Sequence, residues 1–101
     1  MPRVHVNMNQ EEFDQLIAKG QTALALFLKA DVGAGITFAH LANTERVLGD
    51  GPGEHQASNF ARQAYDTVLN LLPRTSMLTG QERKEIEDQL ERLRRLLAEL
   101  Q

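Results

Sequence analysis

Apolar side chains recur at intervals of three and four residues along almost the whole sequence, and this spacing constrains the fold most strongly. Residues spaced in this way share one side of an α-helix, whereas a half-buried strand alternates apolar and polar side chains. Such alternation occurs in Arg3–Asn7, and one strand without a partner does not make a sheet. With 101 residues, 42 % of them hydrophobic, the sequence predicts a single all-α domain over residues 1–101, with residues 1–8 as an extended arm.

The first half of the sequence predicts a short helix followed by a long one. Asn9 and Glu12 have the spacing of a capping box, which favours a helix over residues 10–19. Gly20 is well placed to end that helix, although the helix could also continue through this glycine. A long helix is predicted over residues 21–48, with apolar residues on two of its sides, which is typical of a central helix.

Two further helices follow a segment rich in glycine. Gly49–Gly53 contains three glycines and a proline, so it is predicted to be a loop. The next helix is expected over residues 54–72, because Pro73 disfavours helix in the residue before it. Thr79 begins a second capping box, which predicts the start of the last helix. Short connections place successive helices antiparallel, so we expect an up-and-down bundle of three long helices plus the short N-terminal helix.

Two glycines in the long helix leave two interpretations open. Gly33 and Gly35 each cost about 1 kcal/mol relative to alanine inside a helix, and close approach of a neighbouring helix would compensate. Alternatively, Gly33–Gly35 forms a turn between two shorter helices, which would give five helices. A continuous helix of about 40 Å would overhang its neighbours or bend around them. An overhang would need cover from the short first helix or from a second copy of the chain.

The predicted third helix carries the spacing of a known repeat. The tetratricopeptide repeat pairs a Leu-Gly in its first helix with an alanine, an aromatic residue, a small residue and a closing proline in its second. The matching residues are Leu48, Gly49, Ala61, Tyr65, Val68 and Pro73. This segment therefore resembles that repeat, which implies an antiparallel helix pair with an alanine-rich contact. Together with the last helix, it also loosely resembles the three-helix microtubule-interacting-and-transport domain, which binds partner helices in a groove.

The sequence shows no residue pattern for catalysis or for a metal. The absence of cysteine excludes thiolate nucleophiles and every cysteine-containing zinc site. His5, His40 and His55 lie in separate segments, and none has a second ligand one helical turn away. Ser58 and Ser76 lack the context of a nucleophile elbow. We therefore expect a protein that is not an enzyme and that holds no metal or cofactor.

Charge and hydropathy narrow the class of partner. The 11 basic and 14 acidic residues give a net charge of -3, which disfavours nucleic acid as a partner. Residues 1–9 lack the basic-then-apolar layout of an export signal. The apolar stretch over residues 22–42 is interrupted by Lys29, Asp31 and His40, so we interpret it as a core helix and not as a membrane span. A cytoplasmic protein is expected.

These observations predict a helical module that binds another protein or itself through helix faces, a homodimer included. The candidate contact residues are the only tyrosine and a heptad-like seam on the last helix: Tyr65, Leu90, Leu93, Leu97 and Leu100.

The alternative is a small helical enzyme or ligand carrier with a pocket beside Gly33 and Gly35. Asp31, His40 or Tyr65 would supply its polar contacts.

Overall fold

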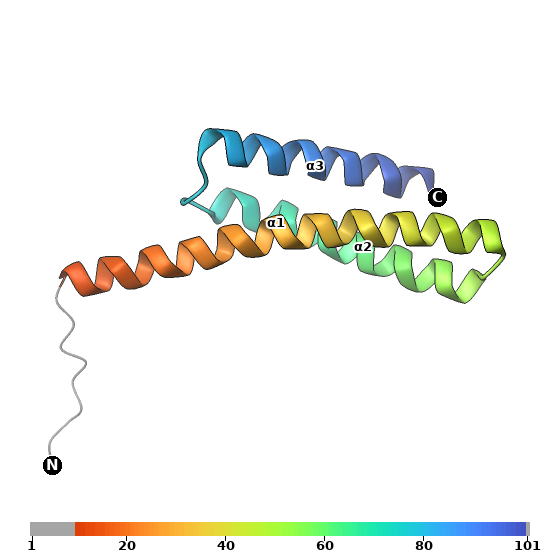
Figure 1. Cartoon of the computed structure of the whole chain (residues 1–101), viewed down its shortest axis with the longest axis horizontal. Helices are drawn as coiled ribbons and strands as arrows, with labels where there is room; N and C mark the ends of the chain where they lie inside the picture. The colour runs from red at the N-terminus through yellow and green to blue at the C-terminus, as the bar shows by residue number, and fades with distance from the viewer. Residues whose placement is uncertain (1–9, 101) are drawn as a thin grey trace, which may run out of the picture.

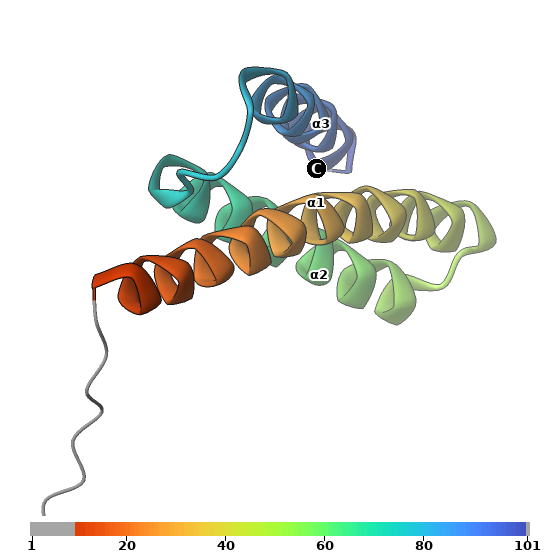
Figure 2. The ribbon, with the colours of Figure 1, turned by 60° about the vertical axis from the view of Figure 1, so that its left-hand side comes forward.

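The computed structural model describes residues 10–100, and the described chain is all-α, as the sequence predicts. Figure 1 shows α2 running back along the C-terminal part of α1, and α3 running in the direction of α1. In Figure 2, α2 and α3 lie on different sides of α1, which packs against both. The extended arm over residues 1–8 and the capping residue Asn9 lie outside the described residues. The elements are α1 (Gln10–Leu48), α2 (Gly51–Leu71), the 3-10 turn η1 (Leu72–Arg74) and α3 (Gly80–Glu99).

The predicted short first helix is not a separate element. α1 continues from Gln10 through Gly20 to Leu48, so the division into a helix over 10–19 and another over 21–48 is wrong. Gly49 is the one described glycine with a positive φ, so Gly20 does not adopt the left-handed conformation that ends a helix. One glycine costs a helix about 1 kcal/mol, and the good helix formers that follow Gly20 outweigh this cost.

α1 is also continuous through Gly33 and Gly35, so the turn and the five-helix alternative are wrong. The surroundings of these two glycines differ. A Cβ added at Gly35 would lie 2.7 Å from Leu93 Cδ2 and 2.9 Å from Ala64 Cβ, whereas one added at Gly33 would meet nothing within 4 Å. The predicted close approach of neighbouring helices is therefore confirmed at Gly35 and not at Gly33.

The N-terminal end of α1 extends beyond the other helices (Figure 1). We call Gln10–Gly20 the α1 overhang: all of its residues are exposed except Ala18, which is half-buried. At its boundary, Gln21 Oε1 accepts a hydrogen bond of 2.9 Å from Ser76 N in the connection between η1 and α3. The expected overhang is present, but the segment that was predicted to cover it is the overhang itself.

The core lies where α1, α2 and α3 meet. Alanines line the contact between α1 and α2, and their small side chains allow the two axes to approach closely. Leucine and isoleucine from α3 fill the space above this contact. The core residues include Leu28, Val32, Ile36 and Ala39 of α1, Ala61 and Val68 of α2, and Ile86, Leu90, Leu93 and Leu97 of α3.

The connection between α1 and α2 is shorter than predicted. Only Gly49, with φ 78°, and Asp50 separate the helices, so the predicted loop over 49–53 is wrong in its last three residues. Asp50 Oδ1 accepts a hydrogen bond of 3.0 Å from Gly53 N, which caps the helix. Pro52 is compatible with the first helical turn, because the missing N–H has no partner there. At the other end, α2 stops at Leu71 and Pro73 lies in η1, which confirms the predicted stop.

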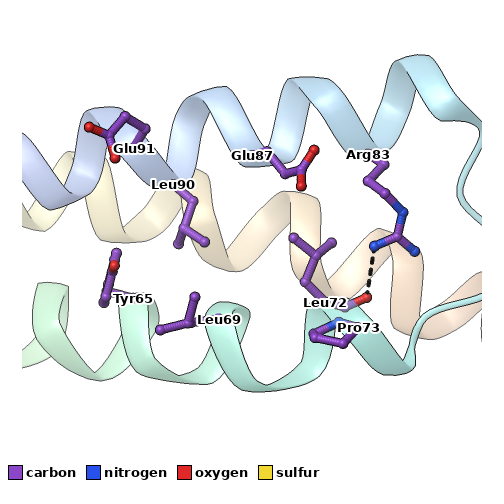
Figure 3. Close-up of a pocket in the computed structure, with 8 residues that line it drawn as sticks. All are labelled: Tyr65, Leu69, Leu72, Pro73, Arg83, Glu87, Leu90 and Glu91. Atoms are coloured by element: carbon purple, nitrogen blue, oxygen red, sulfur yellow. Dashed lines mark hydrogen bonds between the residues drawn. The ribbon is translucent and has the colours of Figure 1, made fainter.

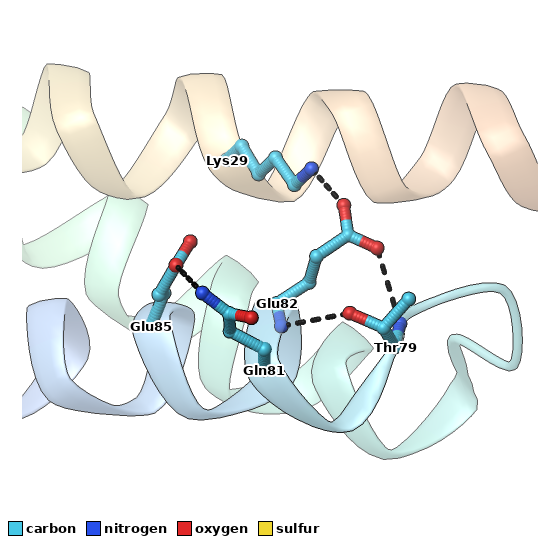
Figure 4. Close-up of polar contacts among 5 residues, drawn as sticks. All are labelled: Lys29, Thr79, Gln81, Glu82 and Glu85. Atoms are coloured by element: carbon cyan, nitrogen blue, oxygen red, sulfur yellow. Dashed lines mark hydrogen bonds and ion pairs between the residues drawn. The ribbon is translucent and has the colours of Figure 1, made fainter.

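The predicted capping box at the start of α3 is confirmed (Figure 4). Thr79 Oγ1 accepts from Glu82 N at 3.0 Å, and Glu82 Oε1 accepts from Thr79 N at 3.1 Å. The other oxygen of Glu82 pairs with Lys29 Nζ of α1. Hydrogen bonding to Lys29, and then to Thr79, lowers the pKa of Glu82. One carboxylate therefore both caps α3 and ties it to α1.

A further cation ties the far end of α3 to the turn between α1 and α2. Arg46 Nε donates to Glu54 Oε2 at 2.7 Å, and Arg46 Nη1 donates to the Glu99 carbonyl at 3.0 Å. Arg46 Nη2 also donates to the Leu100 carbonyl. Because the last carbonyls of a helix have no partner within it, this side chain satisfies the end of α3 as well as joining three helices.

Replacing the two central glycines by alanine should have opposite effects on stability. Gly33→Ala should raise the free energy of unfolding by up to about 1 kcal/mol, because alanine is the better helix former and its Cβ meets open space. Gly35→Ala should lower it by about 1–3 kcal/mol, because Ala64 and Leu93 must move. Urea unfolding followed by circular dichroism measures both. Equal stabilisation by the two variants would contradict the close contact at Gly35.

The pair between Lys29 and Glu82 should make stability depend on acidity. The pKa of Glu82 is lowered from 4.5 in the folded chain, so the pair stabilises the fold above about pH 4.5 and is lost as the pH falls below that value. Glu82→Gln should therefore be less stable than the unaltered chain at pH 7, and the difference should shrink between about pH 5 and pH 3. The control is Glu85→Gln, because Glu85 bonds to Gln81 on its own helix. A difference that is constant with pH would refute the assignment.

Candidate interaction surface

The contact residues predicted on α3 lie inside the folded chain. Leu90, Leu93 and Leu97 are buried in the core, and Leu100 and Tyr65 pack against it half-buried. A heptad spacing is the same whether the partner helix belongs to the same chain or to another, so the pattern alone does not distinguish the two. Here α1 and α2 are the partners of this seam, and the three buried leucines are not available at the surface.

A different apolar surface is exposed along α1. Its residues recur at steps of three or four positions, which is one helical turn, or of seven positions, which is two turns, so they share one side of the helix. Phe13, Leu16, Ile17 and Phe27 are 50, 54, 51 and 47 % exposed. The surface extends from the overhang onto the part of α1 that packs against α2. We call it the α1 stripe; its residues are Phe13, Leu16, Ile17, Leu24, Phe27, Ala34, Phe38 and Leu41.

The C-terminal half of the α1 stripe borders α2. The rings of Phe38 and Phe60 lie 5.0 Å apart between their centres, and Phe60 is itself exposed. Two shallow grooves flank this ring pair along the α1–α2 seam. One, of about 220 Å³, runs past Phe27 and Ala34, and the other, of about 430 Å³, runs past Leu41. No residue of α3 lines either groove.

Asp31 is a charged residue of α1 that lies between two members of the α1 stripe, Phe27 and Ala34. It lines the smaller groove beside Phe27 and Ala34, and among the described residues its carboxylate has no hydrogen-bond or ion-pair partner. Burial raises the pKa of Asp31. Lys19 in the overhang is exposed and likewise has no partner among residues 10–100. The surface therefore presents two unpaired groups of opposite charge.

A further groove, of about 390 Å³, lies between α2 and α3 (Figure 3). Its floor is apolar, with Leu69, Leu72 and Leu90, and Tyr65 lies at one end. Arg83, at its edge, is engaged within the chain. Arg83 donates to the carbonyls of Leu72 and Thr75, at 3.2 and 2.6 Å.

Glu91, at the edge of the same groove, is engaged by its own helix. It accepts two hydrogen bonds from Arg94, at 2.6 and 2.8 Å, and these lower the pKa of Glu91 to about 2. The carboxylate therefore stays ionised and paired, so it is poorly suited to exchange protons at neutral pH.

The candidate catalytic and ligand-binding residues do not converge. Within residues 10–100, no group of three or more metal-ligating side chains is found. His40 Nε2 lies 3.4 Å from Arg92 Nη2, and His55 lies 3.3 Å from Asn59 Nδ2 on its own helix. His5 lies outside the described residues. Leu93 and Ala64 fill the space beside Gly35, and the predicted ligand contacts Asp31 and Tyr65 line separate grooves.

A separate short helix over residues 10–19 would turn its apolar side inward, whereas Phe13, Leu16 and Ile17 of the overhang are about half exposed. The signal that could have located them is the absence of a stop after Gly20. No proline follows it, no glutamate or glutamine completes a capping box with Thr22, and the apolar spacing continues in phase from Phe13 to Phe27.

The length and hydropathy of α1 also satisfy the criterion for a helix able to cross a membrane. An 18-residue window of this 39-residue helix has a mean hydropathy of 1.4, and 33 % of the window is buried against the rest of the chain. The core helix of a folded domain meets the same criterion. Comparison of the chain with protein-family models, with curated proteins and with solved structures finds no match.

Arg83→Gln should destabilise the fold, because the carbonyls of Leu72 and Thr75 lose a charged donor. We expect a loss of about 1–3 kcal/mol in the free energy of unfolding. Arg74→Gln is the matched control, since Arg74 is an exposed arginine of η1, and it should change stability by less than about 0.5 kcal/mol. Guanidinium unfolding of both variants makes the comparison. Equal effects would show that the Arg83 hydrogen bonds contribute nothing specific.

Proposed function

We propose that this chain is a non-enzymatic helical module that binds a protein, a second copy of itself included, through helix faces, with the α1 stripe as the contact surface. The observation that carries this proposal is the continuity of the stripe, which extends from the overhang to the seam between α1 and α2. Contiguous apolar surface of this kind typically marks an interaction site.

The overhang supports the proposal on energetic grounds. Most helical stability in proteins comes from packing of an apolar side, and Gln10–Gly20 has contacts on few of its side chains. Full burial of one large apolar side chain is worth about 1.5–3 kcal/mol, so covering the exposed halves of Phe13, Leu16 and Ile17 would add a few kcal/mol. A partner that packs on the overhang would therefore stabilise both the helix and the complex.

We further propose that the partner is met in the cytoplasm and is neither nucleic acid nor membrane. Lys29 pairs with Glu82, and one side of α1 is buried against α2 and α3, so insertion of α1 into lipid would break contacts within the chain. The net charge of -3 opposes binding to phosphates.

The α2–α3 groove is the place where a second candidate function, carriage of a small apolar ligand, would operate. Its volume of about 390 Å³ and its leucine floor suit such a ligand. The resemblance to the microtubule-interacting-and-transport domain implies that a partner helix binds in a groove. The tetratricopeptide-like residues imply an antiparallel helix pair with an alanine-rich contact.

Polar substitutions in the overhang should weaken association. Leu16→Gln combined with Ile17→Gln should shift any concentration-dependent assembly to at least tenfold higher protein concentration in sedimentation velocity, because about half of each side chain is available for contact. Val47→Gln is the matched control: Val47 is 78 % exposed on the same helix and lies outside the stripe. Circular dichroism confirms that the variants remain helical. Equal shifts for the control would argue against the α1 stripe.

A further inference from the structure

The α1 stripe complements itself when two copies of α1 run antiparallel. We propose, on the basis of the function above, that the partner is a second copy of this chain, with each overhang lying in the α1–α2 seam of the other copy. In this register, facing residues have numbers that add up to 51, and the pairing extends from Phe13 to Phe38. The two-fold axis passes between Ala25 and Leu26.

Apolar side chains of the two copies face each other in this register. Ile17 faces Ala34 of the other copy, and Leu24 faces Phe27 near the axis. Phe13 comes beside Phe38, where the α1–α2 grooves flank the ring pair with Phe60. Each overhang is therefore covered by the part of the other copy that carries the ring pair of Phe38 and Phe60.

The charges of Asp31 and Lys19, which lie beside the stripe residues, also complement each other. Asp31 faces Gly20 of the other copy, and Gly20 has no side chain and no atom within 4 Å of its would-be Cβ, so the approach is open. Lys19 is then level with Asp31 along the helix axis, within the reach of a lysine side chain. Both groups are unpaired within residues 10–100 of one chain, and the two-fold axis would form their pair twice.

The area involved is sufficient for a dimer. The exposed parts of the stripe residues and of Phe60 would cover roughly 600 Å² on each copy, so the pair would bury on the order of 1,200 Å², the lower limit of standard stable interfaces. A lipid surface would cover the same side chains but would leave Asp31 without a counter-ion in an apolar medium, which is costly. A second copy supplies Lys19 at that position.

Cysteine cross-linking tests the register, and the absence of native cysteine makes each introduced thiol unique. In the proposed dimer, Ile17→Cys of one copy lies next to Ala34→Cys of the other, whereas two copies of Ile17→Cys are about 25 Å apart along the axis. A mixture of the two variants should give a cross-linked dimer with a short thiol-specific reagent. Each variant alone should stay at least tenfold less cross-linked than the mixture.

Charge reversal provides a test that does not depend on cross-linking. Lys19→Glu and Asp31→Lys should each raise the dissociation constant at least fivefold, and the double variant should recover to within about twofold of the unaltered chain. Lys84→Glu on exposed α3 is the control and should change the constant less than twofold. Additive weakening in the double variant would overturn the pairing.

The outcomes separate this proposal from the broader one. A dimer by sedimentation in which Ile17→Cys cross-links to itself overturns the antiparallel register and leaves self-association through α1 standing. A chain that stays monomeric at several hundred micromolar and sediments with vesicles of phosphatidylcholine and phosphatidylglycerol overturns both. A chain that stays monomeric at that concentration and does not sediment with the vesicles overturns the second copy as partner.

Discussion

The fold depends on the close contact at Gly35, where α2 and α3 reach α1 at the same level. Ala64 of α2 and Leu93 of α3 both lie so close to Gly35 that a Cβ atom at this position would overlap with them. The missing Cβ costs α1 some helical stability, but it allows three helices to share one core instead of packing in pairs. The alanines on either side of this contact continue the close packing of α1 and α2.

This central contact sets how much of α1 remains uncovered. Because α2 and α3 are about half as long as α1, their packing around Gly35 leaves the first turns of α1 without neighbours. Polar contacts mark both ends of the shared region: Lys29 with Glu82 at one end, and Arg46 with Glu54 and the end of α3 at the other. The α1 stripe lies next to the side of α1 that is covered by α2 and α3. The exposed apolar residues of the overhang and those of the packed part of α1 therefore lie on the same side of the helix.

The sequence and the structure agree best where a local rule operates. The capping box of Thr79 and Glu82 and the stop before Pro73 were predictable from the residues alone, since each depends on atoms within one turn of helix. The errors are of two kinds. The breakers at Gly20 and Gly51–Gly53 were given too much weight, because a glycine is tolerated inside a helix and because Asp50 and Pro52 together favour the first turn. The predicted contact residues Leu90, Leu93 and Leu97 are buried in the core, because a heptad spacing does not show whether the partner helix belongs to the same chain.

The sequence by itself determined that the chain is helical, where most helices begin and end, and that each helix carries an apolar side, because these properties depend on neighbours within a few residues. The tertiary structure decided which apolar side each helix buries. α3 inserts its leucine seam between α1 and α2, whereas Phe13, Leu16 and Ile17 extend past the ends of both neighbours. The relative lengths of the helices and the points where they cross determine which side is buried. These features depend on contacts between residues far apart in the chain, and the periodicity of the sequence does not specify such contacts.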